Sequence, residues 1–201
     1  MKKNLPSLPP GSIDMQLPPR QRLLAAARLL FMQYGIRAVG VDSIAEAAGS
    51  NKMTLYRHFE SKDCLVAEYL RGMAPEEAAF WEQLAAAHAG DPRGQLEAWL
   101  GLIVQGLEGA RGCPLSNAAV EIPEKDHPAR AVIEEQKMAG RNRILELCRA
   151  LGARSPELLA DELFLLIEGA RVSAQSVGPQ GPGAQVKRMA DALIQAHTVS
   201  G

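Results

Sequence analysis

A stretch without carboxylates, residues 52–58, gathers side chains that can donate hydrogen bonds. Such donors reach phosphate oxygens and the edges of bases, and arginine suits the O6 and N7 atoms of guanine. The pattern predicts a surface for a polyanion, and the competing interpretation is a solvated face of an unrelated helical bundle. The donors in this stretch are Lys52, Thr54, Tyr56, Arg57 and His58.

A helix-turn-helix would position these donors. Ala45, Gly49 and Leu55 place a small residue, a glycine and an aliphatic residue where two crossing helices and their turn require them. Leu55 and Phe59, four residues apart, are expected to face inward, which leaves the donors outside. Asn51 is expected to cap the helix that carries them, and Ser61 is expected to cap the next one.

Charge is divided unevenly along the chain. The 201 residues carry a formal net charge of -1, but residues 1–73 hold 10 Lys/Arg against 6 Asp/Glu, whereas residues 74–201 hold 12 against 17. A basic first third and an acidic remainder indicate two tasks, one of which involves a polyanion.

The composition predicts an all-α fold. Ala, Leu, Glu, Gln and Arg dominate after residue 19, and the alternation of β-branched residues that is typical of strands does not occur. Five prolines among residues 1–19 indicate an extended or disordered arm. The expected helices span about 20–34, 41–48, 51–58, 62–72, 75–89, 92–109, 127–151, 156–177 and 183–198, with a short helical turn near 115–121.

Several classes of protein are excluded by what the sequence lacks. No apolar run reaches the roughly 20 residues of a membrane span, and the first residues do not resemble a signal peptide. Cys64, Cys113 and Cys148 are too far apart for a zinc framework. We therefore expect a soluble cytoplasmic protein with no catalytic site, no metal, no cofactor and no membrane partner.

The segments 44–49, 51–59 and 61–63 together resemble the DNA-binding domain of the TetR family of bacterial repressors. The similarity covers about residues 20–72 without a gap, and its most specific part is Leu55-Tyr56-Arg57-His58-Phe59 followed by Ser61-Lys62-Asp63. One departure is Met53, where small residues are common in the family.

The resemblance implies three regions: a disordered arm (1–19), a three-helix helix-turn-helix domain (20–72), and a helical domain for ligand binding and dimerisation (73–201). It also implies a homodimer on a near-palindromic double-stranded operator, which a small-molecule inducer releases. Thr54 and Arg57 are the expected base readers, and the other expected DNA contacts are Ser43, Asn51, Lys52, Tyr56, His58 and Lys62.

In the regulatory half, residues 112–121 and 126–128 are similar to a loop and short helix of one TetR subgroup. We expect a mostly apolar pocket and a hydrophobic inducer, although each polar residue also fits a local structural role. The expected pocket residues are Trp99, Ile103, Cys113, Asn117, Glu121 and Met138, with His127 nearby.

The last two helices carry more apolar surface than a small domain buries, and the resemblance places the dimer interface there. The alternative is a core within one chain. The expected interface residues are Leu163, Leu166, Ile167, Ala170, Ala174, Met189 and Leu193.

Three other functions compete with a ligand-released repressor. A thiol-redox or metal sensor on the same scaffold would use Cys113. An enzyme is disfavoured because no cofactor fingerprint or paired catalytic groups occur. An adaptor bundle without DNA binding is disfavoured by Lys52, Arg57 and Lys62.

Overall fold

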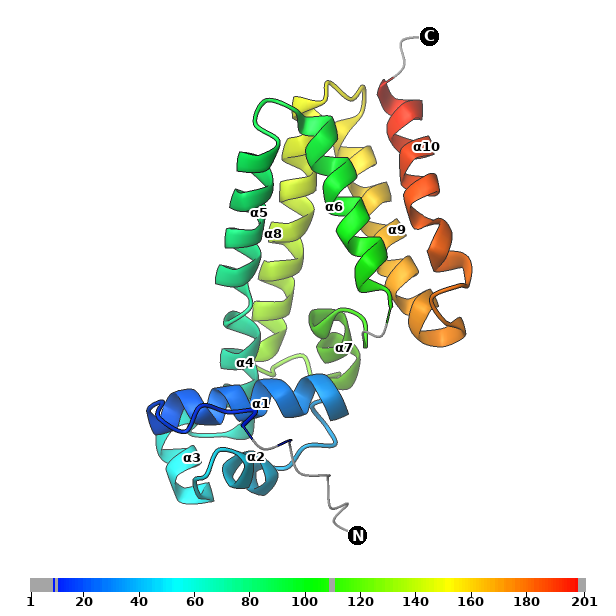
Figure 1. The fold of residues 1–201 in the computed structure, drawn as a ribbon. Coiled ribbons are helices and arrows are strands. Elements are labelled where there is room, and N and C mark those ends of the chain that lie inside the picture. The colour runs from blue at the N-terminus through cyan, green and yellow to red at the C-terminus, as the bar shows by residue number, and fades with distance from the viewer. Residues whose placement is uncertain (1–8, 10, 109–110, 199–201) are drawn as a thin grey trace. The chain divides into compact units, whose positions relative to one another are not determined.

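The computed structural model describes residues 9, 11–108 and 111–198, and these residues form helices, turns and loops without a strand (Figure 1). The all-α prediction is confirmed, and most predicted helix ends lie within three residues of the observed ones. The elements are α1 (Pro19–Tyr34), α2 (Val41–Ala47), α3 (Lys52–Phe59), α4 (Lys62–Arg71), α5 (Ala74–Ala87), α6 (Pro92–Gly106), α7 (Pro114–Glu121), α8 (Ala129–Ala150), α9 (Pro156–Val177), the 3-10 turn η1 (Pro182–Gln185) and α10 (Val186–Thr198).

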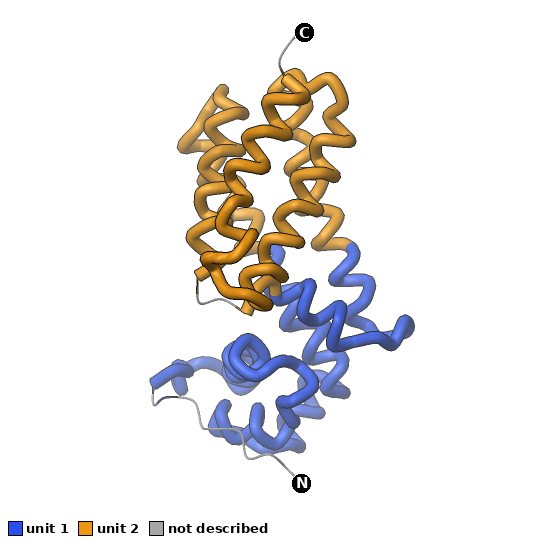
Figure 2. The backbone as a smooth tube through the Cα atoms, turned by 90° about the vertical axis from the view of Figure 1, so that its right-hand side faces the viewer, with its two compact units in different colours: residues 1–74, 114–134 blue, residues 75–113, 135–201 orange. Residues whose placement is uncertain are grey.

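The chain divides into two compact units (Figure 2). The first unit comprises residues 1–74 and 114–134, and the second comprises residues 75–113 and 135–201. The sequence predicted a single domain boundary after residue 72. The observed division differs, because α7 and the first turns of α8 belong to the same unit as α1–α4.

The first unit is built around α1, whose apolar stripe contacts α2, α3 and α4. Leu23 and Leu30 of α1 are buried, as are Leu55 of α3 and Leu65 of α4. Short helices of 7 and 8 residues, α2 and α3, have little stability of their own. Packing on α1 and α4 therefore holds them in place.

The second unit is a bundle of α5, α6, α9, α10 and the larger part of α8. Its core includes Trp81 and Trp99, whose ring centroids lie 5.5 Å apart, and fully buried Leu100 and Leu163. In the part of the chain that the structure describes, no helix is long and apolar enough to cross a membrane.

The expected N-terminal arm lies partly outside the described residues, at 1–8 and 10. Residues 11–18 differ from a disordered arm, because they form turns against the first unit. Ile13 is buried, and the Met15 carbonyl accepts a hydrogen bond from Arg22 of α1 at 3.0 Å.

Candidate nucleic-acid interface

A helix-turn-helix joins α2 to α3. Gly49 has φ +56°, which only glycine adopts at low cost, and the Ser50 N–H donates to the Ala45 carbonyl at 2.8 Å. Ala45 is 3% exposed and Leu55 is 0% exposed, so both lie between the crossing helices. The predicted small residue, turn glycine and aliphatic contact are confirmed.

α3 is fixed at its start by Asn51, whose side-chain oxygen accepts the Thr54 N–H at 2.9 Å. Its inner face buries Leu55 and Phe59, and Arg20 of α1 lies 5.1 Å from the centre of the Phe59 ring. The predicted cap and the predicted inward residues are confirmed. With Leu55 and Phe59 on the inner face, the side chains of Tyr56 and Arg57 between them are exposed.

The outer face of α3 carries exposed Lys52, Tyr56 and Arg57. The Lys52 ammonium lies 5.9 Å from the centre of the Tyr56 ring and 3.9 Å from the carboxylate of Asp42, which is on α2. Both contacts are weak at such exposure. The three side chains are therefore available to an external polyanion.

The other residues predicted to contact DNA are less exposed to solvent or are engaged within the protein. Thr54 and Ser43 are half-buried, and the Asn51 side chain is engaged as a cap. The Nε2 atom of His58 is buried and makes no hydrogen bond to another described residue. The exposed donors are therefore concentrated at Lys52, Tyr56 and Arg57.

The junction between α3 and α4 is a γ-turn at Glu60, with φ 60° and ψ -46°. Among the described residues, Glu60 is the non-glycine residue with positive φ, and the Ser61 N–H donates to the Phe59 carbonyl across it. This turn is rare and strained. Ser61 then caps α4, because its hydroxyl accepts the Cys64 N–H at 3.0 Å.

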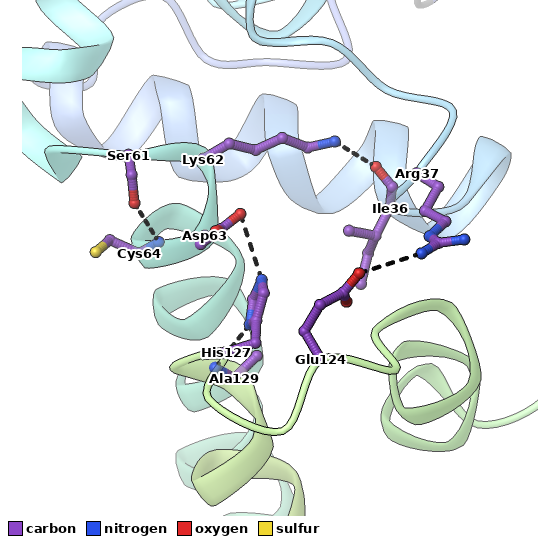
Figure 3. A network of polar contacts seen from close by, with 9 residues as sticks. All are labelled: Ile36, Arg37, Ser61, Lys62, Asp63, Cys64, Glu124, His127 and Ala129. Carbon is purple, nitrogen blue, oxygen red and sulfur yellow. Dashed lines mark hydrogen bonds and ion pairs between the residues drawn. The ribbon is translucent and has the colours of Figure 1, made fainter.

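A polar network in the first unit surrounds the turn between α1 and α2 (Figure 3). The Lys62 ammonium donates to the Ile36 carbonyl at 2.7 Å, and the Arg37 N–H donates to Oε2 of Glu121 at 2.8 Å. Burial lowers the pKa of Lys62 below its usual range, while Asp63 and Glu121 oppose that shift. Lys62 was expected at a phosphate, but here its ammonium is bound to a backbone carbonyl.

The same network includes His127, on the loop between α7 and α8. Its Nδ1 accepts the Ala129 N–H at 3.1 Å, and its Nε2 lies 3.3 Å from Asp63 of α4 (Figure 3). With Nδ1 as an acceptor, the neutral ring carries its proton on Nε2, the ring nitrogen that lies near the Asp63 carboxylate. His127 and Asp63 line a cavity of about 450 Å³ together with Lys62 and Glu121.

The sequence of the first unit and the fold of the chain are similar to those of known proteins. The sequence model described as "Bacterial regulatory proteins, tetR family" matches residues 23–69. Residues 23–69 belong to the TetR family. A TetR-family transcriptional regulator from Streptomyces coelicolor has a solved structure with a TM-score of 0.82 and 26% identity, covering 90% of this chain and 96% of that one.

Two curated relatives extend the comparison. The HTH-type transcriptional repressor KstR2 of Rhodococcus jostii is 40% identical over 79 residues, and that match spans 39% of this chain and 38% of the relative. The probable acrEF/envCD operon repressor of Escherichia coli K12 is 28% identical over 75% of this chain and 71% of its own length. The family groups this chain with regulators and not with enzymes.

The residues of the predicted ligand pocket are divided between the two units. Asn117 and Glu121 belong to the first unit, where Glu121 and His127 line the same cavity. In the second unit, Trp99 is 7% exposed and lies within the core, while Met138 is 49% exposed. Ile103 packs against that core, and Cys113 Sγ accepts a hydrogen bond from Lys137 at 3.4 Å.

The predicted dimer-interface residues also divide into two sets. Leu163, Ile167 and Ala170 are buried in the core of their own chain, as the alternative interpretation proposed. Leu166, Ala174 and Leu193 are half-buried and Met189 is 45% exposed. Sequence reasoning did not identify the apolar side chains of α9 that are exposed. These are Leu158, Leu165, Val172 and Val177.

Among the described residues, no group of three or more His, Cys, Asp or Glu side chains is arranged so that it could hold a metal ion. Glu168 pairs with Arg171 at 3.2 Å, and Lys137 also binds Glu168, at 2.6 Å. These charges satisfy one another within the second unit.

Proposed function

We propose that this protein is a DNA-binding transcriptional regulator that represses genes by binding a near-palindromic operator as a homodimer. The observation that carries the proposal is the outer face of α3, with exposed Lys52, Tyr56 and Arg57 on a capped helix that follows a tight turn. The names of KstR2 and of the acrEF/envCD repressor favour repression over activation.

Arg57 is the proposed base reader, because its exposed guanidinium can bind guanine O6 and N7 together. Thr54, half-buried beside it, is proposed to contact a base edge or a thymine methyl group. Lys52, Tyr56 and Ser43 are proposed to bind phosphates, which fix the register of α3 in the major groove. Asn51 supports the same surface by capping the helix.

The homodimer is proposed to form through α9 and α10. Leu158, Leu165 and Val172 are spaced by seven residues, so they lie on one face of α9, and each is more than half exposed. Met189 adds exposed apolar surface on α10. Exposed apolar surface of this extent favours a second copy, and half-buried Leu166, Ala174 and Leu193 would complete the contact.

Release by a small hydrophobic ligand is proposed for the second unit. Trp99 belongs to its apolar core and Ile103 packs against that core. Met138 of α8 is proposed as a further residue lining the ligand pocket. The ligand must bind the conformation that does not bind the operator more tightly than the conformation that does. Linkage then requires DNA to weaken ligand binding by the same factor.

The test is selection of DNA by the purified full-length protein from a library of randomised duplexes. We expect enrichment of a near-palindrome whose half-sites lie about 34–36 Å apart. Arg57→Ala should relax the preference at one position in each half-site. If the unaltered protein enriches no duplex above the library background, the proposal of a DNA-binding regulator is wrong.

A further inference from the structure

One peptide group in the turn between α1 and α2 is held from both ends. The Ile36 carbonyl accepts the Lys62 ammonium at 2.7 Å, and the N–H of the same peptide, that of Arg37, donates to the Glu121 carboxylate at 2.8 Å. The C=O and N–H of a trans peptide point in opposite directions. A cation and an anion therefore hold this peptide between them with two charge-assisted hydrogen bonds.

The residue before this peptide is shaped to admit the carboxylate. Gly35 ends α1 with φ +85°, and a Cβ placed on it would lie 2.8 Å from one Glu121 oxygen and 3.0 Å from the other. A side chain at residue 35 would thus meet two obstacles, an unfavourable backbone conformation and the carboxylate itself.

Glu121 is held in this position against a local penalty. It is the last residue of α7, and a carboxylate at a helix C-terminus opposes the helix dipole. The Arg130 guanidinium compensates the end of α7 by donating to the carbonyls of Ala119 at 3.1 Å and Ile122 at 3.4 Å. The carboxylate is therefore fixed toward the α1–α2 turn by the packing of residues 114–134.

We propose that Lys62 and Glu121 are positioning residues for DNA reading: together they clamp the 36–37 peptide and so fix α2 and α3 without touching DNA. The inference rests on the proposed function. It assigns Lys62 a different role from the phosphate contact expected from sequence.

The position of the clamp explains how it acts. The held peptide lies four residues before α2 begins, and Lys62 is the first residue of α4, which follows α3. The clamp thus ties the entry to the helix-turn-helix to its exit, with α3 between the two. Glu121 makes this tie depend on residues 114–134, whose two ends both continue into the second unit.

The experiment compares Lys62→Met and Glu121→Ala with the matched control Lys52→Met, an exposed lysine of α3. Binding to a duplex selected by the unaltered protein is measured over a range of salt concentrations. We expect both clamp variants to lose affinity by about tenfold or more, as for loss of a hydrogen bond to a charged group, with the salt dependence unchanged. Lys52→Met should instead reduce the salt slope by about one for each half-site.

A second readout follows the clamped peptide directly. Hydrogen exchange measured by NMR should show faster exchange of the Arg37 amide in Glu121→Ala, with the amides of α3 unchanged. Glu121→Gln, which keeps the shape and a neutral acceptor, should have a smaller effect on both readouts. An unchanged Arg37 amide in Glu121→Ala, or a reduced salt slope in Lys62→Met, would overturn the clamp.

The glycine provides an independent check if one clamp variant folds poorly. Gly35→Ala should weaken operator binding less in the Glu121→Ala background than in the unaltered protein, because the carboxylate that a Cβ meets is gone. Strictly additive losses would count against the clamp. Failure of the unaltered protein to select any duplex would instead count against the proposed function.

Discussion

The two units of this chain are stabilised in different ways. In the first, helices as short as 7 and 8 residues are held by caps, by the glycine at position 49 and by the polar ties of Lys62 and Glu121. In the second, longer helices, of which α9 has 22 residues, surround an apolar core that includes two tryptophans, and exposed leucines remain outside it.

This difference follows from what each unit is proposed to recognise. Reading base edges requires hydrogen bonds at fixed angles, so short helices held by directional contacts are suitable. Binding a second copy or an apolar ligand depends on buried area, which is less sensitive to angle. The family match follows the same division, since it covers residues 23–69.

The largest expected effect is on assembly. Leu165→Glu places a charge on the exposed apolar face of α9, where Leu165 is 68% exposed, so the fold of the chain should survive. We expect monomers by sedimentation and a loss of operator affinity of roughly 100-fold or more, because the two half-sites no longer act together.

The control for assembly is Leu102→Glu, an exposed leucine of α6 in the same unit. It should remain dimeric and bind DNA normally. If Leu165→Glu also sediments as a dimer, this face of α9 is not the dimer interface. The proposal that the second unit binds a second copy through α9 would then be wrong.

The next effect concerns the reading surface. Arg57→Ala should cost about 1–3 kcal/mol on the selected duplex, because an arginine that binds one guanine through two hydrogen bonds is lost. Arg93→Ala, which removes an exposed arginine paired with Glu97 in the second unit, is the matched control. Equal affinities for the Arg57 and Arg93 variants would show that α3 does not read bases through Arg57.

A smaller effect is expected at the strained junction after α3. Glu60→Gly should raise the free energy of unfolding by about 1 kcal/mol, because glycine adopts positive φ without strain. Glu46→Gly, in the regular helix α2, should lower it by a similar amount. Thermal or denaturant unfolding measures both, and a destabilised Glu60→Gly would mean that the turn is not strained.

The smallest effect is on the pH dependence of the second unit. Burial raises the pKa of the Cys148 thiol from 9.0 to about 11, so between these values the unfolded chain loses a proton that the folded chain keeps. Stability should therefore fall as the pH rises through this window. Cys148→Ala should show a weaker fall, and equal slopes for the two proteins would contradict the shift.

Much of the fold was predictable because local signals agreed with one another. Asn51 and Ser61 are caps whose side-chain oxygens bind the backbone three residues on, and Leu55 and Phe59 are buried as their spacing requires. In these cases the information lies within a few residues, where sequence reasoning is strongest.

The clamp was not predictable, because its partners are far apart in sequence. Lys62 and Ile36 are 26 residues apart, and Arg37 and Glu121 are 84 apart. The SKD sequence at 61–63 made Lys62 resemble a phosphate contact, and Glu121 was expected in a ligand pocket. One signal was available: a carboxylate as the last residue of a helix is unfavourable unless a partner compensates it.

The register of α9 was ambiguous for a different reason. Its sequence is apolar on two faces, with Leu163, Ile167 and Ala170 on one and Leu158, Leu165 and Val172 on the other. Periodicity identifies a helix but cannot decide which of two apolar faces packs within the chain. The structure resolves this by burying the first set and exposing the second.

The insertion of residues 114–134 into the first unit has a consequence for synthesis of the chain. The ribosome completes α4 roughly 50 residues before Glu121 emerges, an interval of several seconds at about 5–20 residues per second. During that interval α1–α4 can pack, but the 36–37 peptide lacks its anionic partner. The nascent reading unit thus matures only after residues 75–113 of the second unit have been translated, and a fragment that ends at residue 74 would preserve this immature form.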